Sequence, residues 1–373
     1  MKILHVYKDF DPPVHGGMER HMALMCRFQR EWADVEALTC SRSGFTRRVI
    51  RDGTPVTEVG EWGRFQNAPV SPMFPYYLKR MRADVVVVHV PNPTAEVAYL
   101  LARPAGRLVV RYQSDVVRQA AAMRVYGPVQ MHFLRNADII LPTSSQYLET
   151  SATLRGVRSR CQVVPLGIVA EDFARPDAAR VSEIRAAYGG AFAFFSGRHR
   201  YYKGLEYLVR ATTDIAYPVV IAGDGPERAR LSALASELGL RPLFIGALSH
   251  QELVNHLHAC AVVAFPSVER SEAYGLSILE AHACGKPVVA TKLGTGVEFA
   301  NLDGVTGVNV PPRDSKALAA AINALIEDEP RARRLGEAGR ARVAGELDAR
   351  VIARREFEIY RDVVAGCNKT TGT

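Results

Sequence analysis

The sequence has few of the residues that mark secreted, metal-binding or membrane-spanning proteins. Its 373 residues include six cysteines, which lie far apart and form no CxxC pair, so neither a disulfide framework nor a zinc site is expected. No signal peptide is indicated, because the apolar residues 3–7 are few and are followed by Asp9 and Asp11. The longest apolar run, near residues 83–90, is too short to span a bilayer. These absences predict a cytoplasmic protein with reduced thiols.

Length and periodicity predict two α/β domains. A chain of 373 residues is too long to fold around a single hydrophobic core. Short β-branched runs alternate with amphipathic stretches, an order typical of parallel, doubly wound sheets that bind ligands at the carboxyl ends of their strands. The expected strands are 2–7, 35–39, 84–90, 108–112, 138–141 and 162–164, then 192–196, 218–222, 244–246, 262–265 and 287–290.

We therefore expect two Rossmann-like domains with a cleft between them. The first covers residues 1–170, and the second covers residues 171–345. Residues 340–364 read as one long helix, and the part from 346 to 373 is expected to cross back to the first domain.

The net charge of +8 is shared unevenly. Residues 1–175 carry 23 Lys and Arg against 16 Asp and Glu, whereas residues 176–373 carry 24 against 23. A basic first half favours an anionic partner such as a phospholipid surface, a lipid-linked pyrophosphate or nucleic acid, although an arginine-rich composition alone explains it equally well. Residues 73–82 and 118–135 mix apolar side chains with bases and are candidates for membrane contact, but core packing would use the same side chains.

The most informative stretch is ERSEAYGLSILEAHACGKPVV, residues 269–289. It reads as a loop that enters a short helix, with Glu272 before the helix and Glu280 in its second turn. A helix N-terminus offers backbone N–H groups to phosphate, and carboxylates accept hydrogen bonds from sugar hydroxyls. Two glutamates at this spacing would by themselves be ordinary solvated residues. The residues that form this N-terminus are Gly275, Leu276 and Ser277.

Two further loops suit phosphate. Residues 197–204 are bounded by glycines and carry Arg198 and Lys203. The planar guanidinium of Arg198 can donate two parallel hydrogen bonds to phosphate oxygens, and the ammonium of Lys203 supplies a compact positive charge. After the first expected strand, Gly16 and Gly17 permit close backbone approach before a helix begins.

These motifs, in this order, resemble the retaining GT-B glycosyltransferases of family 4, and the resemblance covers residues 1–342. The run Glu-Arg-Ser-Glu-Ala-Tyr-Gly is most similar to the subgroup that builds bacterial surface polysaccharides. The resemblance implies that Glu272 approaches the donor sugar and Glu280 holds the nucleotide ribose. It also places Arg198 and Lys203 on the leaving diphosphate, and it assigns Gly16 and Gly17 to a loop that closes over that diphosphate and helps to seat the acceptor. By the same resemblance, the domain of residues 1–170 binds the acceptor and the domain of residues 171–345 binds the nucleotide sugar.

The implied reaction is transfer of a hexose from a GDP- or UDP-sugar to an acceptor hydroxyl with retention of configuration. The acceptor is expected to be a lipid-linked or cell-surface glycan precursor at the inner face of the plasma membrane, where the protein would contact anionic lipid. Neither a cofactor nor a metal is expected, since the DxD of Asp9 and Asp11 stands at the first strand, and nucleic acid is not an expected partner. The alternatives are a GT-B-fold epimerase or phosphorylase, and a non-enzymatic protein that binds anionic surfaces.

Gln113 departs from the family pattern. Related enzymes usually have a histidine there, and it contacts the donor sugar near the reacting carbon. Glutamine keeps a donor and an acceptor but does not titrate, so it can position a hydroxyl and cannot carry a proton near neutral pH. His89 is the alternative candidate for this contact.

Overall fold

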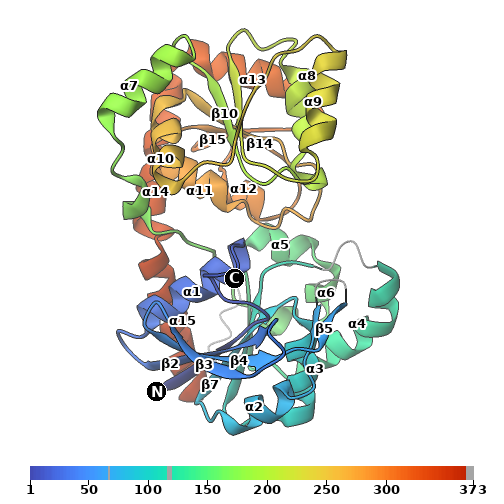
Figure 1. Cartoon of the computed structure of the whole chain (residues 1–373). Coiled ribbons are helices and arrows are strands. Elements are labelled where there is room, and N and C mark those ends of the chain that lie inside the picture. The colour runs from blue at the N-terminus through green and yellow to red at the C-terminus, as the bar shows by residue number, and fades with distance from the viewer. Residues whose placement is uncertain (66–67, 116–119, 367–373) are drawn as a thin grey trace. The chain divides into compact units, whose positions relative to one another are not determined.

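The computed structural model describes residues 1–65, 68–115 and 120–366. They divide into two compact units, unit 1 (Met1–Leu166 with the residues from Ala349 onward) and unit 2 (Gly167–Asp348). In each unit, helices cover a largely parallel sheet (Figure 1). The prediction of two Rossmann-like α/β folds is confirmed.

Unit 1 is built on a seven-stranded sheet in the order β3-β4-β2-β1-β7-β8-β9, with only β3 antiparallel to its neighbour. The sequence of β7, VVVVHV, is buried along its whole length, as expected for a central strand with helices on both faces. The strands are β1 (Lys2–Val6), β2 (Asp34–Ser41), β3 (Arg47–Arg51), β4 (Thr54–Gly60), β7 (Val85–Val90), β8 (Arg107–Tyr112) and β9 (Ile139–Pro142). A separate hairpin pairs β5 (Gly63–Phe65) with β6 (Ala68–Val70).

The last helix of the chain packs within unit 1 against its first helix. Trp32, just after that first helix, meets Phe357 with 5.6 Å between the ring centroids. The helices of this unit are α1 (Gly17–Gln29), α2 (Phe74–Arg80), α3 (Pro93–Ala102), α4 (Ala120–Arg135), α5 (Ser145–Thr150), α6 (Ala152–Arg155) and α15 (Ala349–Val364), with the 3-10 turn η1 (Arg158–Arg160). Among the described helices of both units, none combines the length and apolar composition needed to cross a membrane.

The sequence prediction missed strands β3 to β6 and β15 (Gly307–Val310), and it added one strand that does not form. The strand β3, RRVIR, is arginine-rich and only partly buried, so it lacks the apolar run that predicts a strand. The expected strand 162–164 is wrong, because the chain there makes a single bridge, between Ile140 and Cys161. The carbonyl of Val164 instead accepts a hydrogen bond from the Arg111 guanidinium.

Unit 2 is built on a six-stranded parallel sheet in the order β12-β11-β10-β13-β14-β15. Its strands are β10 (Ala193–Ser196), β11 (Val219–Ala222), β12 (Leu243–Gly246), β13 (Val262–Phe265), β14 (Val288–Thr291) and β15 (Gly307–Val310). Its helices are α7 (Ala178–Ala187), α8 (Leu205–Ala211), α9 (Arg228–Glu237), α10 (His250–Ala259), α11 (Leu276–Ala283), α12 (Gly296–Ala300), α13 (Ser315–Glu327) and α14 (Glu329–Glu346), with the 3-10 turns η2 (Ala170–Phe173) and η3 (Tyr201–Lys203).

The single helix expected over residues 340–364 is wrong, because α14 ends at Glu346 and α15 begins at Ala349. At the break the backbone N–H of Ile168 donates to the carbonyl of Leu347 at 3.1 Å. The N–H of Ala170 donates to Oδ2 of Asp348, also at 3.1 Å. The chain leaves the helix to pair with the segment that opens unit 2, a long-range contact that the local sequence does not reveal.

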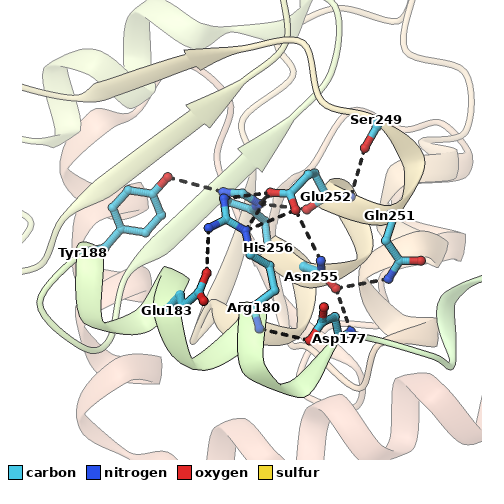
Figure 2. Close-up of polar contacts among 9 residues, drawn as sticks. All are labelled: Asp177, Arg180, Glu183, Tyr188, Ser249, Gln251, Glu252, Asn255 and His256. Atoms are coloured by element: carbon cyan, nitrogen blue, oxygen red, sulfur yellow. Dashed lines mark hydrogen bonds and ion pairs between the residues drawn. The ribbon is translucent and has the colours of Figure 1, made fainter.

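Helix α7, which follows the opening segment of unit 2, is held on α10 by polar contacts (Figure 2). Asp177 caps α7 and its N–H donates to Oδ1 of Asn255 at 2.9 Å. The Arg180 guanidinium donates hydrogen bonds to both carboxylate oxygens of Glu252 at 3.2 to 3.3 Å. Ser249 caps α10. Because Arg180 and Glu252 are partly exposed, the ion pair fixes the orientation of α7 more than it stabilises the fold.

Candidate active site

The centre of the candidate site is a buried ion pair in unit 2. Nζ of Lys203 lies 2.6 Å from Oε2 of Glu272, and the two side chains are 12% and 10% exposed. Lys203 ends η3 and is followed by Gly204 at φ 62°, where a Cβ would come within 2.0 Å of the carbonyl oxygen of Pro266. Only glycine allows this close approach, and it brings the Lys203 loop against the chain that leaves β13.

Glu272 is held by groups on both sides of its loop. The Ser267 hydroxyl donates to Oε2 of Glu272 at 3.0 Å. The Thr295 hydroxyl donates to the Glu272 carbonyl at 2.9 Å, and the N–H of Gly296 donates to the carbonyl of Ala273 at 2.8 Å. The carboxylate is therefore held directly by a hydrogen bond and indirectly by hydrogen bonds that fix the backbone of its loop.

Two glutamates stabilise the positively charged form of Lys203. Burial by itself would lower the pKa of Lys203, but Glu272 first, and then Tyr202 and Glu280, outweigh it and raise the pKa above its usual value. The ammonium also lies 4.8 Å from the centroid of the Phe265 ring, over its negative face. Lys203 is consequently a permanent cation within electrostatic reach of Glu272 and Glu280.

Helix α11 begins beside this pair. Its N-cap residue, Gly275, has φ 87° and supplies no side-chain cap, and a Cβ there would lie 3.0 Å from the Phe265 ring. The first amides of the helix, those of Leu276 and Ser277, are among the N–H groups that an α-helix leaves without intrahelical acceptors. Such a terminus favours an anion, and Glu280 follows one turn later on the same helix.

Arg198 lies at the other end of the loop that carries Lys203. Its side chain is exposed, and it has no ion pair with any residue that the structure describes. The turn at Gly223 packs directly on this loop, since a Cβ on Gly223 would lie 2.0 Å from the carbonyl oxygen of Gly197. The Gly223 turn thus supports the backbone of the loop, whereas the guanidinium of Arg198 remains available to a ligand.

The predicted residues of unit 1 lie at the carboxyl ends of its strands and at the start of α1. Nε2 of Gln113, just after β8, is 3.2 Å from Nδ1 of His89 in β7, so the two candidates for one contact are neighbours. Gly16 is the N-cap of α1 and Gly17 its first residue. A Cβ on Gly16 would lie 2.2 Å from Oε2 of Glu19, which shows that a carboxylate of the chain itself lies against this turn.

The two aspartates of the DxD have partners within the chain. Asp9 accepts two hydrogen bonds from the Arg64 guanidinium at 2.8 and 2.6 Å. Asp11 lies 2.7 Å from Nδ1 of His15. Independence of metal remains a prediction.

The structure brings Lys203, Glu272 and Glu280 together at the start of α11, and it places Gln113 beside His89. It places Arg198 at the other end of the loop that carries Lys203. Sequence analysis did not assign roles to Ser267 and Thr295, which hold Glu272. Both lie after strands of the second sheet, β13 and β14, where ligand-binding residues of such folds gather, and this position is the only signal that could have identified them.

Comparison with known proteins decides the family. Residues 16–167 match the family model "Glycosyl transferase 4-like domain", and residues 182–342 match "Glycosyl transferases group 1". The chain is 35% identical over 348 residues to O-antigen chain mannosyltransferase C of Escherichia coli, covering 92% of this chain and 93% of that protein. This protein belongs to the group 1 glycosyltransferases.

Other relatives agree with this assignment. The glycosyltransferase is 33% identical over 350 residues to the D-rhamnosyltransferase WbpZ of Pseudomonas aeruginosa, covering 92% of this chain and 91% of that protein. Among solved structures, sucrose-phosphate synthase from Thermosynechococcus elongatus matches with a TM-score of 0.81 and 23% identity over 98% of this chain and 99% of that one. HepE from Anabaena, in complex with UDP-glucose, matches with a TM-score of 0.77 and 21% identity over 97% and 100%. The GT-B fold is confirmed.

Proposed function

We propose that this enzyme transfers a hexose from a nucleotide diphospho-sugar to an acceptor hydroxyl and retains the anomeric configuration. The observation that carries the proposal is the buried Lys203–Glu272 pair beside the uncapped start of α11. It combines a permanent cation, a carboxylate and free backbone amides, the groups required by a diphosphate joined to a sugar. The relatives named as mannosyl- and rhamnosyltransferases support the choice of a sugar as the transferred group.

In this proposal the residues of unit 2 divide the donor between them. The N-terminus of α11, at Gly275, Leu276 and Ser277, binds phosphate oxygens, and Lys203 neutralises the negative charge that grows on the leaving diphosphate. Arg198, exposed on the same loop, adds a bidentate contact when the nucleotide binds.

The two glutamates accept hydrogen bonds from the sugars on either side of the diphosphate. Glu280 accepts hydrogen bonds from the ribose, and Glu272 accepts from a hydroxyl of the donor sugar. Because Glu272 is already bonded to Lys203 and Ser267, its side chain is held in one position before the donor arrives. That preorganisation favours the transition state over the free donor.

Retention is assigned to attack on the same face as the departing phosphate. Glu272 is engaged by Lys203 as an ion pair, which makes it a poor nucleophile for a covalent intermediate. A phosphate oxygen of the leaving group accepts the proton of the acceptor hydroxyl, while the C1–O bond to phosphate breaks and the new C1–O bond forms. The protein stabilises charge in this step, and we propose that it needs neither metal nor cofactor.

The test is nucleotide release in the presence of candidate donors. Thermal-shift screening with GDP-, UDP- and TDP-sugars comes first, since a ligand at 100 times its Kd adds about 2.7 kcal/mol to the free energy of unfolding. The matched donor should then release nucleotide only when an acceptor glycan is present, and the anomeric configuration of the product follows from its proton coupling constants. Release of nucleotide without acceptor, or an inverted product, contradicts the proposal.

We also propose that unit 1 contacts the membrane that carries a lipid-linked acceptor. Of the two stretches expected to do so, residues 118–135 begin outside the described residues, and residues 73–82 bury Phe74 and Leu78 in the core. A better candidate is the aromatic corner of Phe45, Trp62 and Phe65, which are 80%, 81% and 69% exposed.

The backbone segments that carry Phe45 and Trp62 lie close together, beside an arginine-rich strand. Gly60 packs on the backbone of Gly44, because a Cβ on Gly60 would lie 2.1 Å from the Gly44 carbonyl oxygen, and this brings the chains around Phe45 and Trp62 together. The arginine-rich strand β3 begins two residues after Phe45. Its arginines pair with Glu58 and Glu36, while Arg47 and Arg48 stay 53% and 66% exposed. Aromatic and basic side chains together suit the headgroup region of an anionic bilayer.

Sedimentation with vesicles tests this contact. The protein should pellet with vesicles of phosphatidylglycerol and remain in solution with phosphatidylcholine, and Trp62→Ser should weaken pelleting several-fold. Val305→Ser, which replaces a 54% exposed apolar side chain of unit 2, serves as the control. Equal binding by wild type and Trp62→Ser removes the aromatic corner as the membrane site and leaves the donor site untouched.

A further inference from the structure

The β5–β6 hairpin of unit 1 carries its charge inward and its apolar side chains outward. Its two strands form a sheet of their own, in which Arg64 pairs with Pro69. Side chains alternate between the faces of a strand, so Arg64 and Pro69 share one face, the inner face, and Phe65, Ala68 and Val70 share the outer face. Pro69 is buried and Arg64 is 16% exposed, whereas Phe65 and Val70 are 69% and 48% exposed. A surface hairpin ordinarily has the opposite arrangement.

Arg64 attaches the inner face to the chain that follows β1. Its guanidinium donates two hydrogen bonds to the Asp9 carboxylate, at 2.8 and 2.6 Å, and two to the Glu61 carboxylate, at 2.8 and 3.1 Å. Asp9 and Glu61 are only 6% and 7% exposed. Asp9 first, and then Glu61, raise the pKa of Arg64 above its usual value although burial opposes them. One permanent cation therefore serves two buried carboxylates.

Two further contacts hold the hairpin at the carboxyl edge of the large sheet. The Thr94 hydroxyl, in the first turn of α3, donates to the Pro69 carbonyl. The Ser71 hydroxyl donates to the Gly60 carbonyl at 2.9 Å and closes the base of the hairpin. Since α3 follows β7 and Asp9 follows β1, the inner face is attached to the segments that leave two neighbouring strands.

Arg64 is the contact on which the position of the hairpin depends most. A two-stranded hairpin by itself is at best marginally stable in water. Without Arg64, the carboxylates of Asp9 and Glu61, which now share its Nη2, would be buried without a cation and close to each other. Ionised carboxylates in such a position return to water. The inner face would then leave the edge of the sheet, and nothing would fix the direction of the outer face.

Exposed arginines lie near the outer face. The chain that enters the hairpin donates a backbone hydrogen bond to Oγ1 of Thr46 at 3.1 Å, and β3 begins at the next residue, Arg47. Arg47 and Arg48 pair with glutamates and remain 53% and 66% exposed. Trp62, just before β5, is 81% exposed. Apolar side chains bordered by exposed arginines fit an anionic bilayer, whose headgroup region accepts the first and whose phosphates attract the second.

We propose that the outer face enters an anionic bilayer, and that Arg64 is the positioning residue that holds this face outward. Phe65 and Val70 lie among the lipid headgroups and the upper part of the acyl chains, with Trp62 beside them. Arg64 itself touches no lipid, because two carboxylates engage its guanidinium on the opposite face. The role of Arg64 at the bilayer depends on the membrane contact proposed above, whereas the attachment of the hairpin by Arg64 does not.

Quenching of Trp62 by brominated lipid tests the position of the outer face. The chain has two tryptophans, so Trp32→Phe in the full chain leaves Trp62 as the one tryptophan that emits. Phosphatidylglycerol vesicles with bromine on their acyl chains should quench this emission strongly and shift it to shorter wavelength. Arg64→Gln should reduce the quenching several-fold. Arg107→Gln removes the same charge at the start of β8, on the opposite edge of the sheet, and should leave the quenching unchanged.

Hydrogen exchange without lipid tests the attachment alone. The amide of Trp62 donates to the Val70 carbonyl at 2.8 Å, and in NMR it should exchange faster in Arg64→Gln than in wild type or Arg107→Gln. Arg64→Lys keeps the charge but not the planar guanidinium that reaches both carboxylates, so it should give intermediate values in both assays. Phe65→Ser should weaken the quenching and leave this exchange unchanged, a result that loss of folding does not produce.

The two assays separate the membrane contact from the role of Arg64. A wild-type protein whose Trp62 is not quenched overturns the membrane contact and leaves the donor site untouched. Quenching in Arg64→Gln equal to that of wild type overturns the positioning role, and unchanged exchange of the Trp62 amide overturns the attachment. If Arg64→Gln does not fold, Arg64→Lys takes its place, and wild-type values in both assays overturn the role of Arg64. Wild-type quenching in Phe65→Ser removes the outer face as the contact.

Discussion

Replacing Lys203 by methionine should separate the stability of the candidate site from its chemistry. Methionine keeps an unbranched side chain one atom shorter than that of lysine and removes the charge, so Glu272 is left buried without its cation and near Glu280. Removing one member of a buried ion pair costs about 3–5 kcal/mol. For a unit of this size, that loss corresponds to a fall in Tm of roughly 6–20 °C.

The double variant Lys203→Met/Glu272→Gln should recover most of the lost stability. It removes both charges, and replacing a whole buried pair by neutral groups is often close to neutral in stability. Turnover should stay about 10²–10³ below wild type in the single and the double variant, because both lack the cation that stabilises the leaving diphosphate. Stability and activity would then respond differently to the same second substitution.

The assays are thermal unfolding followed by circular dichroism and nucleotide release with the matched donor. The control is Arg230→Met, which breaks an ion pair of 2.8 Å with Glu206 whose side chains are 54% and 31% exposed. Its loss should be below about 1 kcal/mol. A Lys203→Met protein with wild-type Tm would refute the buried-pair argument, and wild-type turnover would refute the donor-site assignment.

Three further outcomes are expected. Glu280→Ala should weaken binding of the bare nucleotide diphosphate in calorimetry, whereas Glu272→Ala should leave it nearly intact and lower kcat, and equal losses would contradict this division. From pH 5.5 to 8.5, Gln113→His should keep substantial kcat/KM while Gln113→Ala loses about 1–3 kcal/mol of transition-state binding, and an unaffected alanine variant would transfer the contact to His89. Burial lowers the pKa of His282 to about 4, so the unfolded chain binds the extra proton first and stability should fall as the pH drops from about 6.5 to 4. His282→Gln should flatten that slope in urea titrations, and an unchanged slope would assign it to other groups.

The sequence alone was sufficient to predict what depends on local pattern. Valine-rich runs such as that of β7 are buried on both faces whatever surrounds them, so strand alternation predicted the fold class of both units. Glu272, Gly275 and Glu280 were identified as a site because their order along one loop and helix is itself a local pattern. Lys203 was identified in the same way, from a glycine-bounded basic loop.

Tertiary structure decided everything that depends on partners distant in the chain. The break between α14 and α15 exists because Ile168 and Ala170 pair with Leu347 and Asp348, about 180 residues away. Ser267 and Thr295 acquire their roles only because separate strands end at the same edge of the sheet.

Gln113 shows, within one residue, what the sequence determines and what the tertiary structure decides. The sequence determined that this position cannot titrate and can both donate and accept a hydrogen bond. Which of these it offers to a ligand depends on its bond to His89, and on whatever orients His89 in turn. A glutamine amide has two nearly isosteric orientations, so only its folded surroundings, His89 among them, can distinguish them.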